Sequence, residues 1–252
     1  VTGSHIPEDR NGIKFNHPKG EITKKDEQGI VKQEIEINEN LFDEKGMLLS
    51  PTMLPEIDAT AEEIYVSRYV SFYPANALEG LKIGVYEHSA VGRDILSKVL
   101  QELGAEIISL GRSETFIPVD TEAIREEDSR LAREWAKEGF FAIVSTDGDS
   151  DRPLLSDENG EWLRGDVLGI LAATALGISS VATPVSCNTA LEKCNRFKKI
   201  CRTRIGSPYV IEGMESLAQD FNSIAGYEAN GGFLLQTDVE KAGKILKALP
   251  TR

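Results

Sequence analysis

The sequence predicts an α/β protein that contains two similar α/β units in tandem. From residue 81 onward, short apolar runs with the length of strands alternate with amphipathic segments, in which apolar residues recur every three or four positions. Gly104 and Gly139 close two of the amphipathic segments, as is typical of helix ends. This alternation is the βαβαβ pattern of an open sheet, and 252 residues suffice for two domains with substantial cores.

The first unit is expected to precede residue 164. Its predicted elements are strands at 81–87, 105–111 and 140–146 and helices at 90–104 and 121–139. A hairpin that turns at Glu158, Asn159 and Gly160 is predicted to follow the third strand.

The second unit is expected to begin near Gly165. Its predicted elements are helices at 166–177, 189–197 and 207–221 and strands at 179–186, 198–204 and 223–228. The first 78 residues differ, because residues 1–15 are loop-rich, a charged stretch without clear periodicity follows, and one amphipathic helix is predicted at 60–74. We expect this segment to be part of a domain and not a whole one.

The composition excludes some classes of protein. Acidic residues outnumber basic ones by 41 to 28, and the net charge is -13, so we expect no nucleic-acid partner. No apolar run reaches the ~18 residues of a membrane span, and no signal segment is recognised, so a cytoplasmic protein without membrane contact is expected. Cys187, Cys194 and Cys201 are spaced by seven and are predicted to be buried, inert thiols.

Three aspartates follow the predicted strand at 140–146. Asp147, Asp149 and Asp151 occupy alternate positions, and Arg152 comes next. Carboxylates this close repel one another unless all are solvated or a cation lies between them. Donor sets of oxygen alone suit Mg²⁺ best. The stretch therefore predicts either a magnesium site or a solvated acidic turn.

Two other interpretations of the aspartates stay open. An EF-hand calcium loop would use Glu158 at its twelfth position, but Arg152 stands where that loop needs glycine, and the flanking segment is a strand. A dehalogenase-type phosphatase would use Asp147 as its nucleophile, although Asp151 stands where such enzymes usually have Thr or Val. A calcium-binding α/β module and a phosphatase are thus the alternatives.

Polar residues in three other stretches are candidates for ligand binding. Ser4 lies between Gly3 and His5, with Lys14 behind an Asn-Gly turn, and such a serine is either a nucleophile or a plain turn residue. The other candidates are Glu228 and Asn230 in "GYEANGG", which could bind vicinal hydroxyls, and Gly206, which precedes a predicted helix whose first amides could bind an anion. Glycine-rich turns and ordinary helix starts are the simpler explanations.

Taken together and in this order, "TGSHIPEDRNGIK", "DGDSDR" and "GYEANGG" resemble the motifs of the α-D-phosphohexomutase family. The resemblance implies a multi-domain architecture with mixed sheets. It implies that Ser4 is the phosphorylated residue and that Ser4 and the three aspartates form the Mg²⁺ site. Glu228 and Asn230 would contact sugar hydroxyls, and His5, Lys14 and Arg152 would serve phosphate binding or proton transfer.

The resemblance also implies a reaction. Such enzymes interconvert hexose 1-phosphate and hexose 6-phosphate, here most simply of mannose or glucose, through a phosphoserine and a hexose 1,6-bisphosphate that also acts as activator. Two residues depart from the family's usual pattern, Ile6 where Asn is common and Asn230 where Ser is common.

The family's usual four domains give an expected division of the chain. Residues 1–78 would be the latter part of a first domain, 79–163 a second domain and 164–252 an incomplete third. The chain is accordingly expected to be truncated at both ends relative to the family's usual length.

Overall fold

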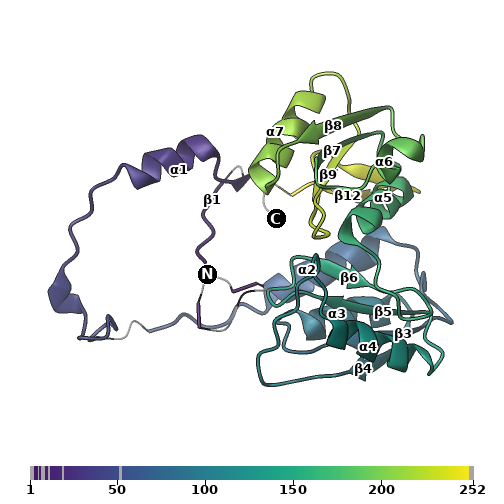
Figure 1. The fold of residues 1–252 in the computed structure, drawn as a ribbon, viewed down its shortest axis with the longest axis horizontal. Helices are drawn as coiled ribbons and strands as arrows, with labels where there is room; N and C mark the ends of the chain where they lie inside the picture. Colours follow the sequence, from purple (N-terminus) through teal and green to yellow (C-terminus); the bar gives the residue numbers. More distant parts are fainter. Residues whose placement is uncertain are drawn as a thin grey trace.

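Two four-stranded mixed sheets follow one another along the chain (Figure 1). They are seen in a computed structural model that describes residues 3–4, 6, 9–10, 12–18, 20–50 and 53–249. The predicted fold class, tandem α/β units with mixed sheets, is confirmed. The expected division into three domains at residues 78 and 163 stays a prediction.

The first sheet has the strand order β4-β3-β5-β6. Its strands are β3 (Lys82–Tyr86), β4 (Glu106–Leu110), β5 (Ala142–Thr146) and β6 (Pro153–Leu155). The central strand β3 is parallel to β4 and β5, whereas β6 is antiparallel to β5. The connecting helices are α3 (Arg93–Glu102) and α4 (Glu126–Ala136). Because the chain leaves β3 toward one side and returns past it to β5, right-handed connections place the two helices on opposite faces.

The second sheet repeats this topology with the order β10-β9-β7-β8. Its strands are β7 (Ser180–Pro184), β8 (Lys199–Thr203), β9 (Ile224–Tyr227) and β10 (Phe233–Leu235). The central strand β7 is parallel to β8 and β9, and β10 is antiparallel to β9. The helices of this unit are α5 (Gly165–Ala175), α6 (Ala190–Lys193) and α7 (Ser207–Leu217).

Alternate residues of the inner strands of the second sheet enter two different cores. Val181 and Tyr227 pack in the core beside α5 and α6, whereas Ala182 and Ile224 pack beside α7. All four are fully buried, which explains why these strands read as nearly continuous apolar runs. The first sheet has a corresponding core on the side of α4, which includes Ile143.

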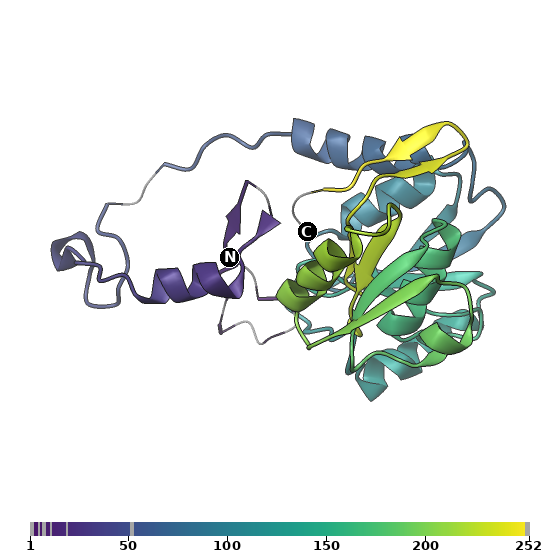
Figure 2. The ribbon, with the colours of Figure 1, turned by 90° about the horizontal axis from the view of Figure 1, so that it is seen from above.

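Helix α2 (Thr60–Phe72) contacts both units. It packs against α3, where Lys98 forms a 2.9 Å ion pair with Glu62. Its other end inserts Phe72 among the apolar residues of the second unit, next to a hairpin of β11 (Val239–Lys241) and β12 (Lys244–Leu246). Figure 2 shows this hairpin lying along α2.

The described part of the chain before α2 has no hydrophobic core of its own. It contains β1 (Asn16–His17), β2 (Gly20–Glu21), α1 (Lys24–Val31) and the short 3₁₀ helix η1 (Glu39–Leu41). Among its described residues only Gly20 is buried, and the side chain of Ile57 is 97% exposed. Figure 1 shows this segment as a wide loop that leaves the two units and returns to α2.

Four details differ from the sequence-based expectations. Helix α4 begins at Glu126 and not at residue 121, because the amides of Glu122 and Ala123 bond to the Asp120 carboxylate and turn the chain there. Helix α1 forms in the charged stretch for which no element was predicted, and the hairpin β11–β12 was also not predicted. Only Cys187 of the three cysteines is buried; Cys194 and Cys201 are partly exposed, and none forms a disulfide. Within the described residues, every helix is too short or too polar to cross a membrane.

Candidate active site

The three aspartates lie in one tight loop, residues 147–152, which we call the aspartate loop. It connects β5 to the antiparallel edge strand β6 at the carboxyl edge of the first sheet, where ligand sites of α/β sheets gather. Asp147 is fully buried, and Asp149 and Asp151 are partly exposed. One carboxylate oxygen from each aspartate can be chosen so that all three lie within 4.8 Å of one another.

Hydrogen bonds within the aspartate loop fix its shape. The Asp147 amide donates to the carbonyl of Arg152 at 3.1 Å, and the Arg152 amide donates back to Asp147 Oδ1 at 3.2 Å. The Ser150 amide donates to the Asp147 carbonyl at 3.2 Å. These bonds turn the chain so sharply that Ser150 adopts a φ of 64°.

A second loop, which follows β3, packs against the aspartate loop and supports it. The amide of Gly92 donates to Ser150 Oγ at 2.9 Å, and the amide of Val91 donates to the Gly148 carbonyl at 3.0 Å. His88, fully buried, lies 2.9 Å from the carbonyl of Thr146. Sequence reasoning missed His88, although a polar residue directly after a predicted strand was a usable signal.

Ser4 reaches the aspartate loop across 143 positions of sequence. Its hydroxyl donates to Asp147 Oδ2 at 2.6 Å. Gly148 makes this approach possible, because a Cβ atom there would collide with the Ser4 carbonyl oxygen. His5 falls outside the described residues, so its predicted role stays a prediction.

Two cationic side chains complete the cluster. The Lys14 ammonium is 2.9 Å from Asp151 Oδ2 and 3.5 Å from Asp149 Oδ2. The Arg152 guanidinium Nε lies 3.8 Å from Asp147 Oδ2 and 3.7 Å from Asp151 Oδ1. Ser4, Lys14 and Arg152 thus each contact the cluster of three aspartates in the structure.

The electrostatics of the cluster favour a bound cation. Burial raises the pKa of Asp147 to about 6, a rise that the Ser4 hydroxyl opposes and that the charges of Asp149 and Asp151 reinforce. Ionisation of the buried Asp147 beside two other carboxylates is costly. A divalent cation bound among the three would offset this cost.

The donor set fits Mg²⁺. Three carboxylate oxygens within 4.8 Å of one another offer the all-oxygen donor set that Mg²⁺ prefers. Asp151 Oδ1 is buried and makes no hydrogen bond within the described part of the chain, which leaves it available as a ligand. The EF-hand interpretation does not fit, because Glu158 lies beyond β6 in an exposed turn.

Glu228 and Asn230 lie in a loop of equivalent position in the second sheet, residues 228–232, which we call the glutamate loop. It connects β9 to the antiparallel edge strand β10. The Glu228 amide donates to the Gly232 carbonyl at 2.9 Å, and the Gly232 amide donates to Asn230 Oδ1 at 2.9 Å. The Gly232 amide is a donor and can bond only to the oxygen of the Asn230 side chain. The Nδ2 group of Asn230 therefore points away from Gly232. Glu228 is 7% exposed.

The two loops lie side by side. Gly231 of the glutamate loop packs against Pro153, the residue that follows the aspartate loop. This contact brings the predicted sugar-contacting residues to the edge of the predicted metal site. Gly206 is the residue before α7, with a φ of 123°, and its predicted role in binding an anion stays a prediction.

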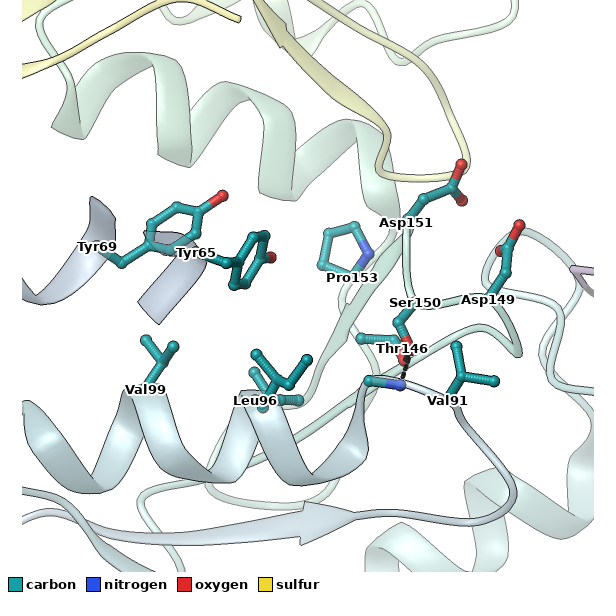
Figure 3. Close-up of a pocket in the computed structure, with 12 residues that line it drawn as sticks. Tyr65, Tyr69, Val91, Leu96, Val99, Thr146, Asp149, Ser150, Asp151 and Pro153 are labelled. Atoms are coloured by element: carbon teal, nitrogen blue, oxygen red, sulfur yellow. Dashed lines mark hydrogen bonds between the residues drawn. The ribbon is translucent and has the colours of Figure 1, made fainter. Parts of the chain in front are cut away.

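A largely apolar pocket of about 580 Å³ borders the aspartate loop (Figure 3). It lies between α2, α3 and the loop, with Asp149 and Asp151 at one end and Tyr65 and Tyr69 at the other. The rings of the two tyrosines pack edge to face, with their centroids 5.1 Å apart. No local sequence pattern indicates this pocket, because it depends on the packing of α2 against α3.

Comparison with protein families finds two consecutive matches. Residues 63–160 match the phosphoglucomutase/phosphomannomutase α/β/α domain II, and residues 164–249 match domain III of the same family. A phosphomannomutase from Salmonella muenchen is 49% identical over 253 residues, which cover 100% of this chain and 51% of that protein. A phosphomannomutase from Sinorhizobium fredii (strain NBRC 101917 / NGR234) is 46% identical over 254 residues, or 100% of this chain and 53% of that protein. The chain therefore spans about half the length of these relatives.

Solved structures agree on the fold. A protein from Thermus thermophilus, solved as a candidate phosphomannomutase, superposes with a TM-score of 0.61 at 20% identity over 86% of this chain and 49% of its own. A phosphoglucomutase/phosphomannomutase family protein from Burkholderia thailandensis gives 0.57 at 16% identity over 70% of this chain and 39% of its own. With two family domains in sequence and relatives at nearly half identity along its whole length, the chain belongs to the α-D-phosphohexomutase family.

Proposed function

We propose that this chain carries the phosphoryl-transfer centre of a phosphohexomutase, with Ser4 as the group that holds the phosphate. The observation that carries the proposal is the 2.6 Å hydrogen bond from Ser4 to Asp147 within a cluster of three aspartates. A serine held on a buried carboxylate, in a cluster that suits a divalent cation, has the setting of a phosphate carrier. The family of the chain supports the same assignment.

Asp147, Asp149 and Asp151, together with an oxygen of Ser4, would hold Mg²⁺. When bound, the ion would supply positive charge that neutralises the aspartates and polarises a phosphoryl group for transfer. Arg152, whose Nε lies within 3.8 Å of two of the aspartates, would orient these carboxylates or bind a phosphoryl oxygen.

The proposed reaction begins with phosphorylated Ser4. A hydroxyl of the hexose monophosphate attacks the phosphorus, the new P–O bond to the sugar forms, and the bond from phosphorus to Ser4 Oγ breaks. The sugar hydroxyl loses its proton and Ser4 Oγ gains one, with Lys14 or His5 as the proton carrier. The resulting hexose 1,6-bisphosphate reorients and returns its other phosphoryl group to Ser4 by the reverse step.

The sugar would be recognised by the glutamate loop. The Glu228 carboxylate accepts hydrogen bonds and the Asn230 Nδ2 group donates them, a combination that suits two adjacent hydroxyls. Because two relatives are named phosphomannomutases, we infer that mannose phosphates are the substrates of this chain. Hexose 1,6-bisphosphate would be the activator.

Mass spectrometry of the intact chain tests the proposal. After incubation with Mg²⁺ and glucose 1,6-bisphosphate or mannose 1,6-bisphosphate, we expect a gain of one phosphoryl group that maps to Ser4. A Ser4→Ala variant should gain none. Phosphate on Asp147 instead of Ser4 would contradict the proposal and support a dehalogenase-type phosphatase.

A further inference from the structure

Thr121 joins the first unit to the glutamate loop of the second. Its hydroxyl donates to the main-chain carbonyl of Asn230 at 2.7 Å. Thr121 is 3% exposed and Asn230 is half-buried, so this hydrogen bond is partly shielded from bulk water. Loss of such a hydrogen bond is costly, because the Asn230 carbonyl would lose this donor while it is only partly open to water.

The segment that carries Thr121 is itself held firmly. Two positions before it, Val119 is fully buried in the core of the first unit. The carboxylate of Asp120 accepts from the amides of Glu122 at 2.9 Å and Ala123 at 3.2 Å, which closes a turn around Thr121. These contacts explain why helix α4 begins later than its sequence pattern suggests, and they aim the Thr121 hydroxyl at a fixed point.

The glutamate loop has little room to move on its other sides. A Cβ atom on Gly165, the first residue of α5, would collide with main-chain atoms of residues 229–231. Gly231 rests against Pro153, next to the aspartate loop. Of the three contacts, those made by Thr121, Gly165 and Gly231, only that of Thr121 is a hydrogen bond. A hydrogen bond depends on direction, so it fixes the orientation of the loop as well as its distance.

We propose that Thr121 is a positioning residue that holds the glutamate loop at a fixed place beside the aspartate loop. Asn230 is held at both of its oxygens, the carbonyl by Thr121 and Oδ1 by the Gly232 amide. Its Nδ2 group therefore has one direction in which to donate. A hexose held by Glu228 and Asn230 is thereby placed with its phosphate at the aspartates, and this part of the inference rests on the proposed function.

Hydrogen exchange of the wild-type chain and a Thr121→Val variant tests the positioning role. Valine keeps the shape of threonine and removes the hydroxyl. We expect the amides of Glu228, Gly231 and Gly232 to exchange ~10-fold or more faster, whereas amides of β3 and β7 stay unchanged. Thr121→Ser, which keeps the hydroxyl, should behave as the wild type. Equal exchange of the three amides in Thr121→Val and wild type would overturn the proposal.

A matched control separates this effect from general destabilisation. Ser145 also donates from a buried hydroxyl to a carbonyl, that of Tyr86, at 2.6 Å within the first sheet. Ser145→Ala should lower the overall stability and leave exchange in the glutamate loop unchanged. If Thr121→Val proves unfolded by circular dichroism, Thr121→Ala, which also lacks the hydroxyl, is measured against Thr121→Ser instead.

Calorimetry with mannose 1-phosphate, with and without Mg²⁺, tests whether the glutamate loop holds the sugar so that its phosphate lies at the aspartates. Mg²⁺ should increase the affinity of the wild type for the sugar phosphate, because both ends of the ligand are then held, and Thr121→Val should lose most of this increase. An increase of the same size in the variant would overturn the functional part of the inference. The two proposals can also fail separately. If Thr121→Val exchanges faster but the wild type does not bind mannose 1-phosphate, the positioning role of Thr121 is supported and the proposed function is contradicted.

Discussion

The ammonium group of Lys14 lies 2.9 Å from Asp151 and 3.5 Å from Asp149, on the carboxylates that we propose as metal ligands. An ammonium and a divalent cation compete for the same negative charge. Lys14 therefore neutralises part of the cluster while no metal is bound, and it must give up at least one of these contacts when Mg²⁺ enters.

Replacement of Lys14 by methionine should strengthen Mg²⁺ binding. The side chain of Lys14 is 42% exposed, so its attraction for the carboxylates is screened by water and the gain should be about two- to fivefold in affinity. Isothermal titration with Mg²⁺, without any sugar phosphate, measures it. Lys14→Arg keeps the charge and should bind as the wild type does; weaker binding by Lys14→Met would show that Lys14 assists the metal.

Removal of a carboxylate should have the opposite effect. Asp149→Ala deletes one of three candidate ligands, and we expect Mg²⁺ affinity to fall by at least ~10-fold. Glu158→Ala is the matched control, because Glu158 is exposed beyond β6 and would be a ligand only in a calcium loop. A loss of Ca²⁺ or Mg²⁺ binding in Glu158→Ala, or equal binding by Asp149→Ala and wild type, would contradict the site.

The sequence predicted the inner strands β3, β5, β7 and β9 correctly because they are largely buried on both faces and read as apolar runs. It failed where a turn decides the structure. The hairpin β11–β12 turns at Ala242 and Gly243, both with positive φ, and alanine is not a residue that marks such a turn. The start of α4 was placed too early because the turn at Asp120 competes with the helix, and no periodicity reveals this competition.

The candidate site was predictable in its parts and not in its assembly. Asp147 and Glu228 each follow a strand directly, which placed both at carboxyl edges of sheets. That the two loops touch depends on contacts such as Thr121 with Asn230, between residues 109 positions apart. The pairing of Ser4 with Asp147 likewise has no local signal, and only the family resemblance suggested it.

Gly148 provides a test of the pairing between Ser4 and Asp147. In Gly148→Ala the added methyl would displace the Ser4 main chain, and a shift of about 1 Å in a reacting group can slow a reaction ~100-fold. We expect phosphate incorporation at Ser4 to slow by that order, while Mg²⁺ still binds. The rate of incorporation is followed by intact mass after addition of glucose 1,6-bisphosphate. Gly29→Ala, in open space on α1, should incorporate phosphate at the wild-type rate; similar rates in both variants would mean that Ser4 does not need this approach.

His88 should make the stability of the protein depend on pH. Its Nε2 group donates to the Thr146 carbonyl at 2.9 Å, since a carbonyl only accepts, and its Nδ1 atom is buried without a hydrogen bond to any described residue. Burial lowers the pKa of His88 below its usual 6.5; the bond to Thr146 and the charge of Asp128 oppose the shift, and Arg125 and Arg93 add to it.

The sign of the effect follows from the lowered pKa. Between pH 6.5 and the lower pKa of the folded state, the unfolded chain takes up a proton at this imidazole and the folded protein does not. In that range the free energy of unfolding falls as the pH falls, by up to ~1.4 kcal/mol per pH unit. Urea unfolding at pH 7.5 and pH 5.5 should therefore show a larger loss in the wild type than in His88→Gln, which does not titrate. Asp147, with its raised pKa, acts in the opposite direction, but it does so in both proteins, and the difference between them isolates His88. Equal losses in the two proteins would mean that His88 takes up its proton in the folded state as readily as in the unfolded chain.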